Sequence, residues 1–181
     1  NAQSIQKPGA MDALKFYNRT TDYDSIFLCE SWLKSTTADA ELSFNNQYQV
    51  FRCDRGDRGG GVCLLVKRHI PVLRRFDEID SDDHGAIRVI CVYLTPTGSA
   101  SDRLKRLQSF RSFIDMASRT EFPLLLIGDF DLPRIDWMDP YRHAQGTLEG
   151  SFIDLCMEYG VIQLISTPTH KAGGILDLLL T

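Results

Sequence analysis

The sequence predicts an α/β sandwich, in which mainly antiparallel β-sheets are covered by helices. Two observations carry this prediction. Compact apolar and β-branched runs, typical of strands, are interrupted by stretches whose apolar residues recur at helical spacing. Several of the strands also look antiparallel, because a glycine-rich turn joins neighbouring runs, and this favours a layered sandwich over a simple array of parallel strand–helix–strand units.

The first half of the chain predicts one short helix and five strands. Met11, Leu14 and Tyr17 fall at helical spacing and predict an amphipathic helix. The turn over 54–61 predicts a hairpin, because its glycines permit positive φ and a tight reversal. The strands are predicted at 25–30, at 47–53 with an edge at Asp54, at 61–67, at 71–76 as an edge-like strand, and at 86–94.

The second half predicts two helices and three strands. The longer helix is capped by Ser99 or Ser101, and its apolar stripe consists of Leu104, Leu107, Phe110, Phe113, Ile114 and Ala117. The second helix has Thr147 as its N-cap and Gly160 as its terminator, and its apolar residues are Leu148, Phe152, Leu155, Cys156 and Tyr159. The strands are predicted at 123–130, 161–165 and 175–180.

Length and composition exclude several classes of protein. The 181 residues predict one domain, 1–181, and no apolar run approaches the ~20 residues of a membrane span. Five cysteines without a C-x-x-C pair indicate neither a disulfide framework nor a zinc site, which fits a reducing compartment such as the nucleus or cytoplasm. The net charge of -4 argues against a protein that holds nucleic acid by bulk charge alone.

Three carboxylates lie at or near the ends of apolar runs: Glu30, Asp129 and Asp177. A charge beside a core strand is costly unless it is paired or bound to a metal, and carboxylate oxygens are natural ligands of Mg²⁺. The alternative is that Glu30 and Asp129 are loop acids just outside a sheet. Asp177, inside a strand, needs a partner in either case.

Six segments, in order, resemble the endonuclease/exonuclease/phosphatase superfamily, and most closely the endonuclease of non-LTR retrotransposons. Asn1 in NAQSI resembles the first-strand Asn motif, and Glu30 in CESWL the metal-binding Glu motif. Tyr93 in VYLTP resembles the tyrosine motif of that family. The remaining segments are RGGGVCLLVK, GDFDLPRIDW at 128–137 and PTHKAGGILDLLLT at 168–181. The resemblance implies a four-layered sandwich, here incomplete at both ends, without the first strand and the C-terminal Ser-Asp-His region.

The resemblance also implies a role for each matching residue. Glu30, helped by Asn1, would bind Mg²⁺, or Mn²⁺ in its place. Asp129 would orient or deprotonate the attacking water, Tyr93 would hydrogen-bond the phosphate, and Asp177 would orient a catalytic histidine. The expected product is a nick in duplex target DNA, which primes the reverse transcriptase domain of the same polyprotein. We expect a monomeric, intracellular protein without a membrane partner.

Two departures from the family pattern lead us to expect weak or no activity. Asp131 stands where the family carries Asn, and an ionised carboxylate offers a phosphate only acceptors. None of the four histidines of the chain has the Ser-Asp-His context, and His170 is interpreted as a surface residue in a polar turn. Two alternatives therefore stay open: a phosphoesterase acting on RNA or on inositol or lipid phosphates, and a non-catalytic remnant that binds nucleic acid or protein.

Two further groups of residues, one basic and one aromatic, each allow two interpretations. Arg52, Arg55 and Arg58 in and around the hairpin either bind the DNA backbone or form an ordinary solvated face. Trp32 and Trp137 either stack on bases or pack beneath a loop. The basic residues interpreted as the solvated face of the long helix are Arg103, Lys105, Arg106, Arg111 and Arg119.

Overall fold

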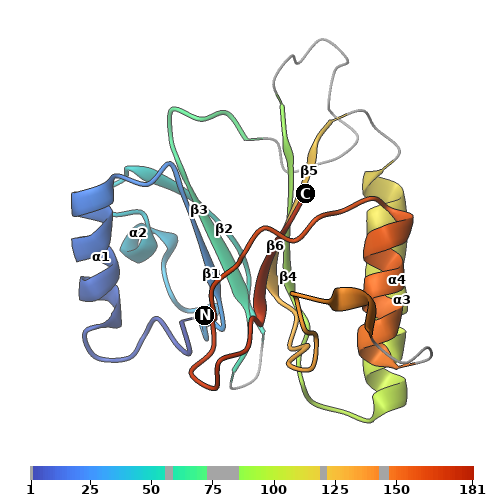
Figure 1. The fold of residues 1–181 in the computed structure, drawn as a ribbon. Coiled ribbons are helices and arrows are strands. Elements are labelled where there is room, and N and C mark those ends of the chain that lie inside the picture. Colours follow the sequence, from blue (N-terminus) through green and yellow to red (C-terminus); the bar gives the residue numbers. More distant parts are fainter. Residues whose placement is uncertain (1, 56–58, 73–85, 119–121, 143–146) are drawn as a thin grey trace. The chain divides into compact units, whose positions relative to one another are not determined.

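A computed structural model describes residues 2–55, 59–72, 86–118, 122–142 and 147–181 of the chain (Figure 1). The chain forms two compact units, Asn1–Glu78 and Ile79–Thr181. Each unit contains one three-stranded sheet covered by its own helices, which confirms the predicted α/β class with two sheets. No helix among the described residues has the length and apolarity to cross a membrane.

The first unit is built on an antiparallel sheet in the order β1-β3-β2. Its strands are β1 (Ser25–Cys29), β2 (Tyr48–Cys53) and β3 (Val62–Lys67), and its helices are α1 (Ala10–Thr21) and the four-residue α2 (Asp39–Leu42). The antiparallel pairing of β2 with β3 confirms the predicted hairpin. Met11 and Leu14 of α1 pack against a core that includes Tyr48 and Leu65, as the predicted amphipathic helix requires, but Tyr17, the third residue of the predicted apolar face, is 60% exposed.

The second unit is built on a mixed sheet in the order β4-β5-β6. Its elements are β4 (Arg88–Tyr93), α3 (Ala100–Ala117), β5 (Leu124–Asp129), the 3₁₀ helix η1 (Pro140–Arg142), α4 (Leu148–Glu158) and β6 (Asp177–Leu180). The strands β4 and β5 are parallel, whereas β5 and β6 are antiparallel. The prediction of mainly antiparallel sheets therefore holds only for the first unit, because the 18-residue helix α3 provides the long crossover that a parallel pair needs.

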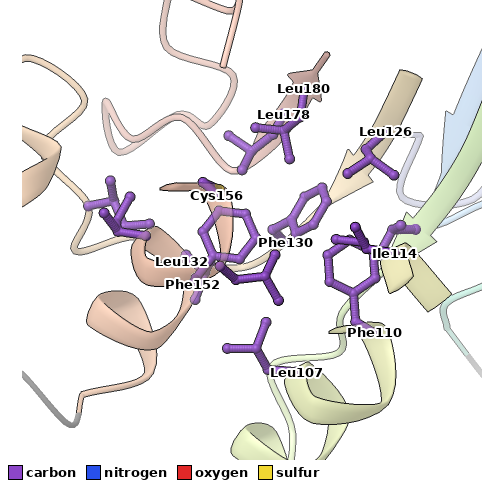
Figure 2. Close-up of a cluster of buried hydrophobic side chains, with 14 residues drawn as sticks. Leu107, Phe110, Ile114, Leu126, Phe130, Leu132, Phe152, Cys156, Leu178 and Leu180 are labelled. Carbon is purple, nitrogen blue, oxygen red and sulfur yellow. The ribbon is translucent and has the colours of Figure 1, made fainter. Parts of the chain in front are cut away.

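Helices α3 and α4 bury one face of this mixed sheet (Figure 2). Phe130 lies at the centre of the core, with its ring centroid 5.6 Å from that of Phe110 on α3 and 5.2 Å from that of Phe152 on α4. Both helices begin as predicted: the Ser99 side chain accepts a hydrogen bond from the amide of Asp102, and Thr147 accepts one from Gly150. Of the two predicted caps of α3, Ser99 is the one used.

Two predicted strands do not appear as such. The segment 161–165 is not a strand, although main-chain bonds of Ile162 and Leu164 and a bridge at Gln163 join it to residues 179–181. The Gln163 side chain bonds instead to the main chain of Ile165 two residues ahead. Of the strand predicted over 71–76, residues 73–76 lie outside the described residues, and Pro71 and Val72 are not in a strand.

Gly128 in β5 is the position where the sheet tolerates no side chain. A Cβ atom there would lie 2.0 Å from the carbonyl oxygen of Val92 on β4. We expect Gly128→Ala to lower the free energy of unfolding by about 3 kcal/mol or more, because backbone rather than a flexible side chain must move. Gly174→Ala is the control, since its Cβ would meet only Leu176 at 3.9 Å. Urea unfolding measures both, and equal losses would contradict the close approach.

Candidate active site

Three of the predicted catalytic residues lie in one row across the sheet of the second unit. Tyr93, the last residue of β4, is the register partner of Asp129, the last residue of β5. Asp129 is in turn the partner of Asp177, the first residue of β6. Side chains alternate along a strand, and Val92, Leu126 and Leu178 face the helices. The row Tyr93–Asp129–Asp177 therefore lies on the opposite face from α3 and α4.

Asp129 is the most buried member of this row, with 6% of its surface exposed. Its Oδ1 atom accepts a hydrogen bond of 3.1 Å from the amide of Asp131. Its carbonyl accepts another, of 2.8 Å, from the amide of Leu94 after β4. The carboxylate is therefore held at the strand end by the loop that follows it.

The loop before β6 holds Asp177 through its main chain. Thr169 Oγ1 accepts hydrogen bonds from the amides of Leu176, at 2.9 Å, and of Asp177, at 3.0 Å. His170 lies in the predicted turn, closed by a bond from the Gly173 amide to the His170 carbonyl, but its side chain is half-buried and not fully at the surface. His170 also acts on Asp131, whose pKa it lowers through its charge.

Asp131 adopts a left-handed conformation with φ 45°. Asn and Asp tolerate this region better than most residues, so the conformation suits both the family's Asn and the Asp of this chain. Burial raises the pKa of Asp131, while the charges of Arg103 and His170 oppose this effect without cancelling it. The Asp131 carboxylate is therefore partly buried, with the guanidinium of Arg103 beside it.

Arg103 supplies the main cation to this loop. Its Nη2 atom donates to the carbonyl oxygen of Asp131 at 2.6 Å and lies 3.3 Å from its Oδ2. Arg106, one turn along α3, donates to the carbonyl oxygens of Thr95 and Thr97 after β4. The interpretation of these two arginines as part of a solvated face was wrong, because both donate hydrogen bonds to carbonyl oxygens in the loops that follow β4 and β5. Helical spacing alone does not show which polar side chains of a helix donate hydrogen bonds to carbonyl oxygens in loops.

Glu149 is a buried carboxylate that sequence reasoning missed. It lies in the first turn of α4 with 2% exposure, and Arg134 binds both of its oxygens at 2.9 Å. Burial raises its pKa, but the hydrogen bonds from Arg134 and the backbone, with the charges of Arg134 and Arg103, hold the pKa below its usual value. The sequence carried one signal for this residue: an acid in the first turn of a predicted helix, where the helix dipole stabilises a negative charge.

Glu30 lies in the first unit, directly after β1. It has φ 55°, which is unusual for a residue with a long side chain. Its Oε2 atom accepts hydrogen bonds from the Gly60 amide, at 3.0 Å, and from the Trp32 indole. Gly59, Gly60 and Gly61 all have positive φ, so the glycine-rich turn brings its backbone close to this carboxylate.

The predicted partner of Glu30, Asn1, lies outside the described residues. The residues after it run beside the end of β1: the amide of Ala2 donates to the Cys29 carbonyl at 2.8 Å, and that of Ser4 to the Glu30 carbonyl at 2.7 Å. These bonds bring the N-terminal segment to the strand end that carries Glu30.

The three arginines of the hairpin differ in their surroundings. Arg52 is largely buried; it bonds to the Thr37 carbonyl at 2.7 Å and pairs with Asp39 at 3.1 Å and Asp54 at 3.6 Å. Arg55 is exposed. Arg58 lies outside the described residues. Only Arg55 of the two described arginines therefore has its guanidinium at the surface.

The donor chemistry of the predicted site fits Mg²⁺. Glu30, the predicted cation ligand, offers carboxylate oxygens, the ligands that this hard cation prefers. Within the described ranges no three His, Cys, Asp or Glu side chains gather as a metal cluster. Each unit contributes its carboxylates separately: Glu30 in the first, and the Asp129–Asp177 pair in the second.

The fold and these residues define a class: an α/β protein of two sheets, with acidic side chains at the ends of its strands. Residues 1–180 match the model of the Endonuclease/Exonuclease/phosphatase family, and the chain belongs to this family. Its name describes nucleases and phosphatases, enzymes that hydrolyse phosphate esters. No curated protein matches the chain significantly.

Solved structures share the fold at low sequence identity. A 3′-5′ exonuclease from Neisseria meningitidis is similar with a TM-score of 0.71 and 16% identity, covering 99% of this chain and 84% of that one. An AP endonuclease from Archaeoglobus fulgidus has a TM-score of 0.65 and 12% identity, covering 99% and 83%. A second structure of the Neisseria enzyme, NExo, described as a 3′ phosphatase bound to a product DNA hairpin, has a TM-score of 0.69 and 15% identity, covering 99% and 83%.

We expect Glu149→Gln to destabilise the protein by about 1–3 kcal/mol at pH 7, because it removes a charged acceptor from Arg134. The lowered pKa of Glu149 stabilises the fold above the usual carboxyl pKa, and this contribution is lost as the pH falls through the pKa of the folded state. The difference between parent and variant should therefore narrow below pH ~4.

Urea unfolding at several pH values measures this difference. Glu158→Gln is the control, because the Arg111–Glu158 pair is about half exposed, at 51% and 46%, and should contribute under about 1 kcal/mol. A Glu149→Gln loss that does not change with pH would show that the carboxylate charge is not the cause.

Proposed function

We propose that this chain hydrolyses phosphodiester bonds of DNA and nicks one strand of a duplex target. The observation that carries the proposal is the row Tyr93–Asp129–Asp177, which the strand register places side by side at one end of a sheet. A buried carboxylate and a tyrosine at neighbouring strand positions offer a proton acceptor and a hydrogen-bond donor, two groups that can assist the attack of water on a phosphate. The solved relatives named for exonuclease, AP endonuclease and 3′ phosphatase activities support the reaction class.

Each residue has a defined task in this proposal. Asp129 orients the attacking water and accepts its proton. Tyr93 donates its hydroxyl to a phosphate oxygen. Asp177 is placed to orient a catalytic histidine, a group that none of the four histidines of this sequence matches. Glu30 holds the divalent cation, assisted by Asn1; when bound, Mg²⁺ supplies Lewis-acid stabilisation of the phosphate and of the leaving oxygen.

The order of the six motifs supports an origin in a non-LTR retrotransposon. In that setting the 3′ hydroxyl of the nick primes a reverse transcriptase domain of the same polyprotein. Target-primed synthesis takes place where the DNA is, so the protein would act in the nucleus.

We expect Asp129→Asn to slow plasmid nicking in Mg²⁺ by about 10²–10⁴-fold, because an amide accepts no proton from water. Glu30→Gln should abolish nicking, since it removes the anionic cation ligand. Lys105→Gln, which changes an exposed residue of α3, is the control and should nick at the parent rate. Conversion of supercoiled to open-circular plasmid measures the rate. Full activity in Glu30→Gln would show that the ligand assignment is wrong.

Asp131→Asn tests whether the departure from the family pattern limits the rate. Asn keeps the left-handed conformation, while its amide replaces a desolvated anion with a donor toward the phosphate. We expect nicking to rise about 10²–10³-fold, the worth of one such donor. Asp139→Asn, which removes an equal charge from an exposed position of the same segment, should change nothing. An unchanged rate in Asp131→Asn would favour the non-catalytic alternative.

A further inference from the structure

The first unit contains a cavity of about 710 Å³ beside Glu30. This volume falls within the ~300–1,000 Å³ typical of ligand pockets. Its walls include Trp32, Leu33, Lys34 and Arg55, together with the polar side chains of Gln6 and Thr36. Trp32 and Gly59 line the cavity and also border the Glu30 carboxylate: the indole donates to Oε2, and a Cβ at Gly59 would lie 3.9 Å from the same oxygen. A ligand in the cavity therefore lies next to Glu30.

The indole of Trp32 is held in place on this wall. Its N–H is bonded to Glu30, and its main chain is in the left-handed region at φ 53°, anchored by a 3.0 Å bond from its amide to the Gly60 carbonyl. The ammonium of Lys7 lies 5.8 Å from its ring centroid. A fixed aromatic ring at a pocket wall is the surface on which a nucleic-acid base stacks, because every base has a π face.

Two cationic side chains on the rim of the cavity can meet the phosphate of a ligand. Lys34 and Arg55 are exposed side chains on its rim. Neither forms an ion pair with another described residue. Asp54, which also lines the cavity, has Oδ2 3.6 Å from Nε of the largely buried Arg52, a guanidinium that it shares with Asp39 at 3.1 Å. The cavity thus combines an aromatic wall, two cations and hydroxyl or amide groups that can bond to a sugar or a base edge.

We propose that this cavity binds one unpaired nucleotide of a DNA strand, with the base against Trp32 and the phosphate against Lys34 and Arg55. The proposal rests on DNA being the substrate of the proposed function, and it adds the place where the strand is held beside the cation ligand Glu30. An unpaired nucleotide is chosen over a paired one, because stacking on Trp32 needs a base face that a duplex keeps within its own stack.

Trp32 itself provides the test. The chain has two tryptophans, so the variant Trp137→Phe leaves Trp32 as the single indole reporter. Octathymidylate is titrated into this variant in EDTA, where cation-dependent cleavage is absent, and the fluorescence is recorded. We expect saturable quenching of Trp32 that weakens with added salt. Adding Trp32→Phe to the same variant should remove the signal and weaken binding, measured by anisotropy of a labelled oligonucleotide, about fivefold or more.

Charge variants in the Trp137→Phe background locate the phosphate. Lys34→Gln with Arg55→Gln should weaken binding about tenfold, whereas Lys105→Gln should leave it unchanged. Equal effects of the two charge changes, or no quenching at saturation, would overturn the proposal. The nicking assay is read separately. Binding at Trp32 without cleavage would refute the proposed function alone, whereas cleavage without contact at Trp32 would refute the nucleotide site alone.

Discussion

The close approach of β5 to β4 at Gly128 is the constraint on which the second unit depends. No side chain fits between this residue and the Val92 carbonyl, so the two parallel strands meet at main-chain distance. Gly128 and Val92 are register partners, and the same register places Tyr93 beside Asp129. The antiparallel partner β6 then adds Asp177 to the same row. A slip of one residue would turn these side chains toward the apolar core under α3 and α4, where an unpaired carboxylate is costly.

Buried charge around this row is balanced by arginines from outside the sheet. Arg103 reaches from α3 to Asp131, whose amide in turn bonds to Asp129, so one helix orients the carboxylate at the strand end through a single loop. Arg134 and Glu149 join the continuation of that loop to the start of α4. The GDFDLPRIDW segment is thus both a carrier of site residues and a connector between helices. Asp129 and Asp131 of this segment belong to the candidate site, whereas Arg134 joins the segment to α4.

In the first unit, too, a carboxylate is held by hydrogen bonds near the end of a strand, but the groups that hold it differ. Its carboxylate is not on a strand but in a left-handed residue after one, and the donors to it come from a glycine-rich turn and an indole. A Glu in this conformation is strained, and surrounding bonds must hold it there. The bonds from the 2–5 segment to the carbonyls of 29–31 provide that restraint. Order in the N-terminal segment and the orientation of Glu30 are therefore linked.

The sequence by itself determined the α/β class, the three longer helices, the hairpin and the strand ends that carry Glu30 and Asp129. These follow from local periodicity and turn chemistry, which act within a few residues. The sequence placed Asp177 inside a strand, whereas Asp177 is the first residue of β6, and it did not show the short helix α2. Only the tertiary structure decided the parallel pairing of β4 with β5, the bridge that replaced a strand at 161–165, and the roles of Arg103, Arg106 and Glu149. Each of these depends on a partner far away in the chain, and the period of a helix or strand carries no information about which distant carbonyl or guanidinium it will meet.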